Sequence, residues 1–306
     1  MKMRWKHLCA LFSIFFLILI VLKLVPDKEW FQPKNSFTDE RIAVFVRTST
    51  QTAKTRLPLL LQTWIGSSNR SVIVTSPGHV DHKNSTHVSF VQSNCFSKNR
   101  RLNQCCQLAF SLSYSIREFP TAFWTCHFDD DSFVNTGQLK TYLSQFSHLT
   151  DYYIGRNSLA TPSSVINKED KRQHYFYFAT GGAGLCLSRP LLMKLKSFVD
   201  PGQYISQCDQ TGLSDDVLLG YLLSKEVGVR LTITNRLHSH LEDLSAMKRE
   251  LLQKQITLSY NLNYENKVSL PNMWNIDDST GFKRLTCLIY GVGVSQSCES
   301  TTHKLV

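Results

Sequence analysis

Short apolar runs rich in β-branched residues alternate with longer segments of helical periodicity, and this alternation constrains the fold more than any other feature of the chain. Apolar runs of this kind are typical of strands that are buried on both faces of a sheet. We expect strands at 42–46, 71–75, 88–91, 123–128, 152–155 and 229–234, and helices at 56–65, 101–118, 137–145, 189–199 and 215–225. Strands that alternate with helices predict an α/β fold, in which ligands bind at the carboxyl ends of the strands.

One predicted strand, Phe123–Phe128, leads directly into three aspartates, Asp129, Asp130 and Asp131. Three carboxylates at the mouth of a sheet repel one another, and a hard divalent cation with oxygen ligands relieves that repulsion. Side chains alternate along an extended chain, so we expect Asp129 and Asp131 on one face and Asp130 on the other. The sequence favours a metal site here, and the structural alternative is a solvated turn or a helix N-cap.

Two further polar pairs follow predicted elements. His238 and His240 come after the last predicted strand, and an extended backbone would present both imidazoles to one face, as in a metal site or a proton shuttle. Pairs of this kind are more often surface or core residues. Asp215 and Asp216 open an apolar helical stretch, where a helix cap and a catalytic base are equally supported. A cation bound by an aspartate, a histidine, waters and a diphosphate suits Mn²⁺ better than Mg²⁺, because imidazole is an intermediate ligand.

Composition and motifs exclude several classes of protein. An apolar fraction of 42% and an aromatic fraction of 11% support a packed core, which rules out a disordered chain. The nine cysteines lack zinc-finger spacing, and the net charge of +10 includes no Lys/Arg blocks typical of nucleic-acid binding. The absence of a P-loop and of a Gly-x-Gly-x-x-Gly motif disfavours common NTPases and dinucleotide enzymes. The TGGAG sequence at Thr180–Gly184 either lets the backbone approach a ligand closely or makes a tight turn.

The amino terminus carries an apolar segment. Residues 8–22 contain no charge, and as a helix the segment 8–25 would span roughly 27 Å, enough for a thin bilayer. Three cations in the first six residues favour a cytosolic amino terminus. A cleaved signal peptide is the alternative, but the segment ends without the small residues of a cleavage site. We therefore expect a cytoplasmic tail at 1–7, a signal-anchor transmembrane helix at 8–25, a stem at 26–39 and one lumenal catalytic domain at 40–306.

Two features agree with a lumenal domain. Asn69 and Asn84 begin N-glycosylation sequons in polar, turn-like stretches. Apart from Cys9 in the apolar segment, eight cysteines remain, an even number that is compatible with disulfides in an oxidising compartment. Buried free thiols are the alternative. The sequence thus predicts a single-pass membrane glycoprotein whose bulk lies in the lumen of the secretory pathway.

The ordered set of motifs resembles that of the fringe proteins, a family of β1,3-N-acetylglucosaminyltransferases that act on O-linked fucose. The motifs include WTCHFDDDSFVN, FYFATGGAGLCLSR, LSDDVLLGYLL, LHSHLE and QITLSYNLNYENK, in family order. The resembling stretches are 62–67, 124–135, 153–159, 176–189, 213–223, 237–242 and 255–267, which extend over nearly all of 41–298. The resemblance implies the glycosyltransferase-A fold, a Rossmann-like mixed sheet flanked by helices, and inversion at the anomeric carbon.

The resemblance also implies roles for individual residues. Asp131 and His240 would bind Mn²⁺, Asp130 and Arg56 would contact the donor UDP-GlcNAc, and Asp216 would be the catalytic base. The acceptor would be O-linked fucose on epidermal-growth-factor-like repeats of Notch-type receptors or ligands. Such an enzyme would modulate Notch signalling in development from the Golgi membrane, with its catalytic domain in the lumen. Two alternatives are a related β1,3-transferase with a different UDP-sugar and a non-catalytic glycan-binding protein of the secretory pathway, and the retained metal and base residues favour catalysis.

Cysteines and departures from the family complete the comparison. The family pattern suggests disulfides Cys95–Cys106, Cys126–Cys186 and Cys287–Cys298. It leaves the pairing of Cys105 and Cys208 open. The chain has Val217 where the family usually has a cysteine, Leu237 where it has a phenylalanine, and Phe96 where a common sequon would continue. These departures leave the implied metal ligands and base intact.

Overall fold

The structure is a computed structural model that describes residues 41–67, 72–79, 87–166, 171–260, 270, 276, 278–291 and 298. Internal contacts divide the chain into a unit of residues 1–36 and a unit of residues 37–306, and all described residues belong to the second unit. The expected tail, anchor and stem, and the sequons at Asn69 and Asn84, lie outside the described residues. None of the described helices is both long and apolar enough to cross a membrane.

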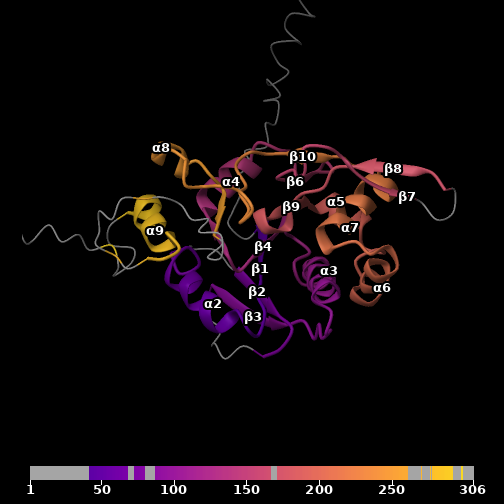
Figure 1. The fold of residues 1–306 in the computed structure, drawn as a ribbon, viewed down its shortest axis with the longest axis horizontal. Helices are drawn as coiled ribbons and strands as arrows, with labels where there is room; N and C mark the ends of the chain where they lie inside the picture. Colours follow the sequence, from indigo (N-terminus) through magenta and orange to yellow (C-terminus); the bar gives the residue numbers. More distant parts are fainter. Residues whose placement is uncertain are drawn as a thin grey trace, which may run out of the picture. The chain divides into compact units, whose positions relative to one another are not determined.

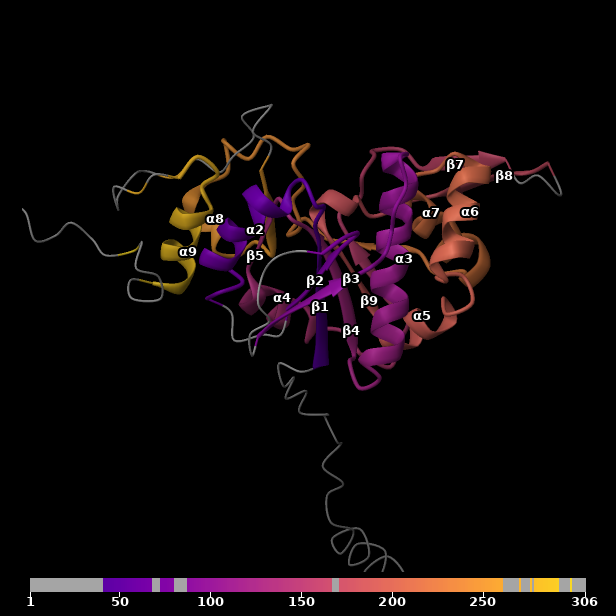
Figure 2. The same cartoon turned by 90° about the horizontal axis from the view of Figure 1, so that it is seen from below.

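A seven-stranded mixed sheet forms the centre of the second unit (Figures 1 and 2). Its strands are β1 (Ile42–Arg47), β2 (Val72–Ser76), β3 (Val88–Gln92), β4 (Trp124–Asp129), β6 (Tyr153–Gly155), β9 (Leu185–Ser188) and β10 (Leu231–Ile233). They lie in the order β10-β6-β9-β4-β1-β2-β3. β9 runs antiparallel to both β4 and β6, whereas the other neighbouring strands are parallel. The α/β prediction is confirmed, and β9 is the one strand of this sheet that the sequence pattern does not predict.

Helices cover both faces of the sheet (Figure 2). They are α2 (Ala53–Gln62), α3 (Arg100–Glu118), α4 (Thr136–Leu143), α5 (Arg189–Lys194), α6 (Pro201–Thr211), α7 (Asp215–Leu222), α8 (Arg249–Leu252) and α9 (Phe282–Tyr290). Successive residues of β1 point to opposite faces, so the strand supplies both layers of the core. Ile42, Val44 and Val46 belong to the cluster that includes α2 and α9. Phe45 packs on the other face, against Tyr114 of α3.

Two short two-stranded sheets lie outside the main sheet, and the sequence pattern predicts neither. β7 (Ser163–Ile166) pairs antiparallel with β8 (Gln173–Phe176). β5 (Ser132–Val134) pairs antiparallel with β11 (Thr257–Ser259). Because β5 begins directly after Asp131, its pairing brings a segment more than a hundred residues away against the acidic turn.

The antiparallel direction of β9 decides what lies at the carboxyl end of β4. The start of β9, rather than its end, is at this edge of the sheet, and the 3₁₀ turn η2 (Gly181–Ala183) precedes it directly. Gly184 joins the turn to the strand with φ +87°, and a Cβ there would lie 2.2 Å from Cδ1 of Phe128. Both the left-handed φ and the contact with a buried ring require glycine at this position.

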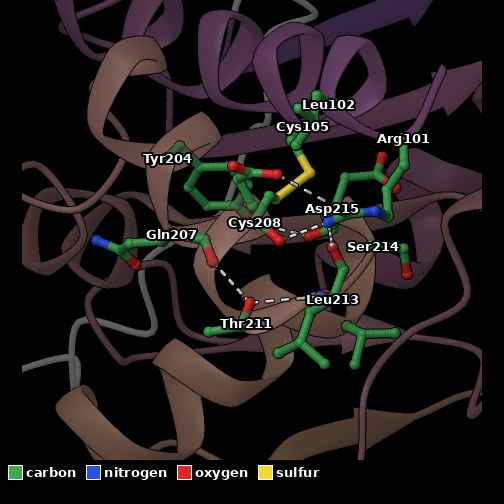
Figure 3. Close-up of a disulfide and its surroundings, with 12 residues drawn as sticks. Arg101, Leu102, Cys105, Tyr204, Gln207, Cys208, Thr211, Leu213, Ser214 and Asp215 are labelled. Atoms are coloured by element: carbon green, nitrogen blue, oxygen red, sulfur yellow. Dashed lines mark hydrogen bonds and ion pairs between the residues drawn. A yellow bond between two sulfur atoms is a disulfide. The ribbon is translucent and has the colours of Figure 1, made fainter. Parts of the chain in front are cut away.

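Four disulfides are present among the described residues. Three join the pairs that the family pattern suggests, Cys95–Cys106, Cys126–Cys186 and Cys287–Cys298. The fourth joins Cys105 of α3 to Cys208 of α6, the two cysteines whose pairing the sequence leaves open (Figure 3). Cys126 and Cys186 are register partners in β4 and β9, so their disulfide ties the strand that ends in the acidic turn to the strand that follows η2.

Candidate active site

The three consecutive aspartates do not continue the extended chain. Asp129 is the last residue of β4, while Asp130 and Asp131 form the turn into β5. Asp129 pairs with Arg47, at 2.7 Å. Asp130 and Asp131 both face Nη1 of Arg56, at 2.7 and 3.4 Å. The expected alternation of faces is therefore wrong, because the turn separates Asp129 from two carboxylates that share one guanidinium.

Asp130 is enclosed by the segment that joins β1 to α2. Thr48 and Thr52 donate hydrogen bonds to its Oδ2, at 2.7 and 2.5 Å, and Arg56 donates to its Oδ1. The residue is only 5% exposed. Hydrogen bonds from two hydroxyl groups and a guanidinium give both oxygens of this buried side chain a partner. Asp130 thus fixes the acidic turn against the start of α2, and its predicted contact with a donor stays a prediction.

Asp131 and His240 meet although 109 positions separate them in the sequence. Nδ1 of His240 lies 3.8 Å from Oδ2 of Asp131. Burial raises the pKa of Asp131 to about 6 and lowers the pKa of His240. Oδ1 of Asp131 and Nδ1 of His240 are buried, and neither has a hydrogen-bond partner within the described residues.

These two side chains fit a divalent cation. A buried carboxylate oxygen and a neutral imidazole nitrogen without partners are costly unless a ligand satisfies them, and Mn²⁺ accepts both donor types. Within the described part of the chain no group of three or more His, Cys, Asp or Glu side chains is arranged around one metal position. The binding of Mn²⁺ by Asp131 and His240, with waters and a diphosphate completing the shell, stays a prediction.

His238 has a different environment from His240. Its Nδ1 lies 3.0 Å from Oε2 of Glu242, and its Nε2 lies 3.0 Å from Oε1 of Gln255. The residue is 6% exposed. The two imidazoles do not share one site: His238 lies between Glu242 and Gln255, as the alternative of a core residue predicts, whereas His240 lies near Asp131. His238 holds the loop in place, and His240 alone faces the acidic turn.

Asp216 is fixed at the amino end of α7. Its Oδ2 accepts a hydrogen bond from the backbone N–H of Gly181, at 2.9 Å. Its Oδ1 accepts from Oγ of Ser214 and from the N–H of Val217, at 2.8 and 2.9 Å. Burial and then the charge of Asp215 raise the pKa of Asp216. The result is an oriented carboxylate whose affinity for a proton is greater than usual, as a general base requires.

The turn η2 lies against both Asp216 and His240. A Cβ on Gly181 would lie 3.6 Å from Oδ2 of Asp216, and a Cβ on Gly182 would lie 2.9 Å from Nδ1 of His240. Consecutive Cα atoms are about 3.8 Å apart, so Asp216 and His240 approach the same turn at neighbouring positions. Ser259 of β11 donates to the carbonyl of Gly182 at 2.9 Å and fixes the turn.

One family of known proteins matches most of the chain. Residues 37–292 match the family described as Fringe-like, and this range contains every residue of the site. The chain belongs to the fringe family. The radical fringe β1,3-N-acetylglucosaminyltransferase of Notophthalmus viridescens is 34% identical over 264 residues, which cover 84% of this chain and 66% of that protein. The lunatic fringe enzymes of Xenopus laevis and Danio rerio are 30% and 34% identical, over 87% and 84% of this chain and 72% and 70% of theirs.

Solved structures of other glycosyltransferases are more distant. A glycosyltransferase involved in glycosylation of the major capsid of PBCV-1 has 11% identity and a TM-score of 0.35, over 71% of this chain and 93% of that one. Mouse xyloside xylosyltransferase 1 in its apo form has 9% identity and a TM-score of 0.37, over 63% of this chain and 84% of that one.

This fringe-family chain also contains a site residue that the sequence reasoning missed. Arg47, at the end of β1, contacts both Asp129 and Asp215. The available signal was a cation that ends the apolar run IAVFV, in a strand whose other residues are all apolar. A buried arginine needs carboxylate partners, so it indicates that acids from other elements lie nearby.

Side chains of α3 and α6 contact the backbone of the connection between α6 and α7 (Figure 3). Tyr204 donates a hydrogen bond from its hydroxyl to the backbone carbonyl of Asp215, at 2.6 Å. Arg101 donates to the carbonyl of Leu213, at 2.8 Å, and also to that of Cys208. In this fringe-family chain the Cys105–Cys208 disulfide therefore lies one turn of α6 from Tyr204, whose hydroxyl contacts the backbone directly before Asp216.

Proposed function

We propose that this chain is an inverting, Mn²⁺-dependent transferase that moves GlcNAc from UDP-GlcNAc, in β1,3 linkage, to O-linked fucose. The observation that carries the proposal is the meeting of Asp131 with His240, while His240 and Asp216 lie against neighbouring glycines of η2. The matched relatives are named as β1,3-N-acetylglucosaminyltransferases, which supports the choice of sugar and linkage. The mixed sheet that ends in an acidic turn agrees with a glycosyltransferase-A fold.

Asp131 and His240 are the residues that would hold the cation. When bound there, Mn²⁺ supplies charge neutralisation for the two phosphates of the leaving UDP. Arg56 adds a protein cation on the same side, since its guanidinium lies against both Asp130 and Asp131. Its side chain is 33% exposed, so it is accessible to a diphosphate. These residues would bind and orient the donor.

Asp216 acts as the general base of the proposed reaction. Its carboxylate takes the proton from the 3-hydroxyl of fucose while that oxygen attacks the anomeric carbon from the face opposite the phosphate. The new bond joins the fucose oxygen to the anomeric carbon, and the bond from that carbon to the phosphate oxygen breaks. A single displacement of this kind inverts the configuration and requires no covalent intermediate on the protein.

The proposal also names the acceptor and the cellular compartment. Fucose on epidermal-growth-factor-like repeats of Notch-type receptors or ligands is the acceptor that family membership favours. The four disulfides are compatible with an oxidising lumen, and the apolar segment at 8–25 would anchor the chain in the Golgi membrane.

A donor panel tests this proposal on the full-length protein in detergent. The protein is incubated with an O-fucosylated repeat, Mn²⁺ and either UDP-GlcNAc, UDP-galactose or UDP-glucose, and the product is identified by mass. We expect transfer of GlcNAc with Mn²⁺ and none with a chelator. Transfer from another donor in place of UDP-GlcNAc would identify a related β1,3-transferase, and no transfer by folded protein would contradict the function.

The base is tested by a substitution that keeps the shape of the side chain. Asp216→Asn removes the proton acceptor, so turnover should fall by roughly 10²-fold or more while binding of UDP and Mn²⁺ stays within about twofold. Asp209→Asn is the matched control, because Asp209 is 68% exposed on α6 and lies outside the site. If the Asp216 variant keeps its turnover, the base has been assigned to the wrong residue.

A further inference from the structure

Arg47 joins two elements that carry the proposed chemistry. Its Nε and Nη2 lie 2.9 and 2.7 Å from Oδ1 of Asp129, which ends β4. Its Nη1 lies 2.5 Å from Oδ2 of Asp215, which begins α7. The side chains of all three residues are at most 18% exposed. One guanidinium therefore connects the end of a strand with the start of a helix that is 86 residues further along the chain.

Both partners of Arg47 stand next to residues of the site. Asp129 directly precedes the turn with Asp130 and Asp131, and Asp215 directly precedes Asp216. A shift of either partner carries its neighbour with it, because adjacent residues share a rigid peptide plane. The distance between the acidic turn and Asp216 is therefore set in part by the two arms of this guanidinium.

The two arms require an arginine. A guanidinium presents its N–H groups in a planar fork, so it can contact one carboxylate with Nε and Nη2 and another with Nη1. A lysine presents one nitrogen on a flexible stem and cannot reproduce both arms. Leaving one of the carboxylates buried without its partner is costly, so that carboxylate, and the backbone that bears it, would move toward water.

We propose that Arg47 is a positioning residue that holds the amino end of α7, and with it Asp216, at a fixed separation from the acidic turn. This inference rests on the proposed transferase function. Arg47 acts through Asp129 and Asp215 and does not contact the donor, because all three of its guanidinium nitrogens already face carboxylates and the residue is 8% exposed. In a displacement that needs nucleophile, base and leaving group in line, a misplacement of about 1 Å costs on the order of 10²-fold in rate.

The test is Arg47→Lys in the full-length protein, with Arg284→Lys as the matched control. Arg284 of α9 forms another buried ion pair, with Asp278, outside the site. For Arg47→Lys we expect kcat to fall by roughly 10- to 100-fold, while the Kd for UDP with Mn²⁺ stays within about threefold. For Arg284→Lys we expect both quantities to stay near those of the wild type, even if the midpoint of thermal unfolding falls.

A second readout does not depend on turnover. Hydrogen exchange of the segment 213–223, which contains the start of α7, should become faster in Arg47→Lys than in the wild type and should not change in Arg284→Lys. Unchanged exchange in Arg47→Lys would overturn the positioning role, whatever the activity. A Kd for UDP that weakens as much as kcat falls would instead identify Arg47 as a donor contact and also overturn the proposal. If the wild type transfers no sugar but exchange responds as expected, the transferase function fails and the positioning of α7 stands.

Discussion

The two glycines of η2 offer the sharpest perturbation of the candidate site. Neither Gly181 nor Gly182 has a left-handed φ, so alanine is compatible with the backbone at both positions. A glycine-to-alanine change in a compatible conformation stabilises a protein by about 0.4–1 kcal/mol through the unfolded state. Both variants should therefore fold, and any loss of function must come from the added methyl group.

The structure gives the size of each disturbance. At Gly182 the new Cβ would lie 2.9 Å from Nδ1 of His240, and ordinary contacts begin near 3.4 Å, so the imidazole must retreat by roughly 0.5 Å. At Gly181 the new Cβ would lie 3.6 Å from Oδ2 of Asp216, which is an ordinary contact. A metal ligand that loses its support typically loses about 10- to 100-fold in affinity, or about 1.4–2.8 kcal/mol. We expect a loss toward the lower end of this range for Gly182→Ala, because His240 retains freedom to adjust.

The assay is a Mn²⁺ titration of initial transfer rates at saturating donor and acceptor. It is paired with direct Mn²⁺ binding by electron paramagnetic resonance in the presence of UDP. Gly182→Ala should raise the Mn²⁺ midpoint by roughly tenfold and recover much of its rate at high Mn²⁺. Gly181→Ala, with the same methyl group one residue earlier, should leave the midpoint within about twofold. Equal midpoints in the two variants would refute the assignment of His240 as a ligand that lies against Gly182.

Three further expectations concern other parts of the site and its support. Burial raises the pKa of Asp216, and a base must be deprotonated, so transfer should fall as the pH drops through that raised pKa. Ser214→Ala removes a hydrogen bond that lowers this pKa, so it should move the acid limb of the pH–rate profile to higher pH. His238→Ala should lower the free energy of unfolding by about 1–3 kcal/mol in urea while leaving the Mn²⁺ midpoint unchanged, and a shifted midpoint would contradict its purely structural role. The double substitution Cys105→Ala and Cys208→Ala removes a disulfide between residues 103 positions apart and should lower the free energy of unfolding by about 2–5 kcal/mol. Thermal denaturation of this variant and of the wild type under non-reducing conditions measures the difference.

The elements that sequence reasoning predicts are those with a strong local signal. β1 is a run of apolar residues that is buried on both faces, and α3 is long, amphipathic and capped by Asn99, whose side chain accepts from two backbone N–H groups. α6 was missed because its apolar stripe consists mainly of Tyr204 and Cys208. It nevertheless carries a start signal, since Asp200 caps it and Pro201 is its first residue.

The parts that sequence reasoning misses depend on pairing between distant segments. β9 has only four residues, and its antiparallel direction follows from hydrogen bonds to β4 and β6 rather than from its own sequence. Family resemblance predicts the set of residues and implies that Asp131 and His240 meet, and the structure brings these two side chains together. The backbone pairing that brings them together is not predicted. The meeting of Asp131 with His240 requires β5 to pair with β11, and the two arms of Arg47 require its register with Asp129. No local pattern contains that information.

The adjacent cysteines of α3 have a consequence for how this chain reaches its native state. Cys106 bonds to Cys95, 11 positions away, and its neighbour Cys105 bonds to Cys208, 103 positions away. During oxidation both thiols of α3 compete for the nearby Cys95, because short loops close more readily than long ones. If Cys105 instead of Cys106 bonds to Cys95, only Cys106 is left to pair with Cys208 of α6. Thiol–disulfide exchange is then needed to restore the native pairs. Secretion of active protein should therefore depend on disulfide isomerase activity, and yield from a host that lacks it should be dominated by shuffled, inactive isomers.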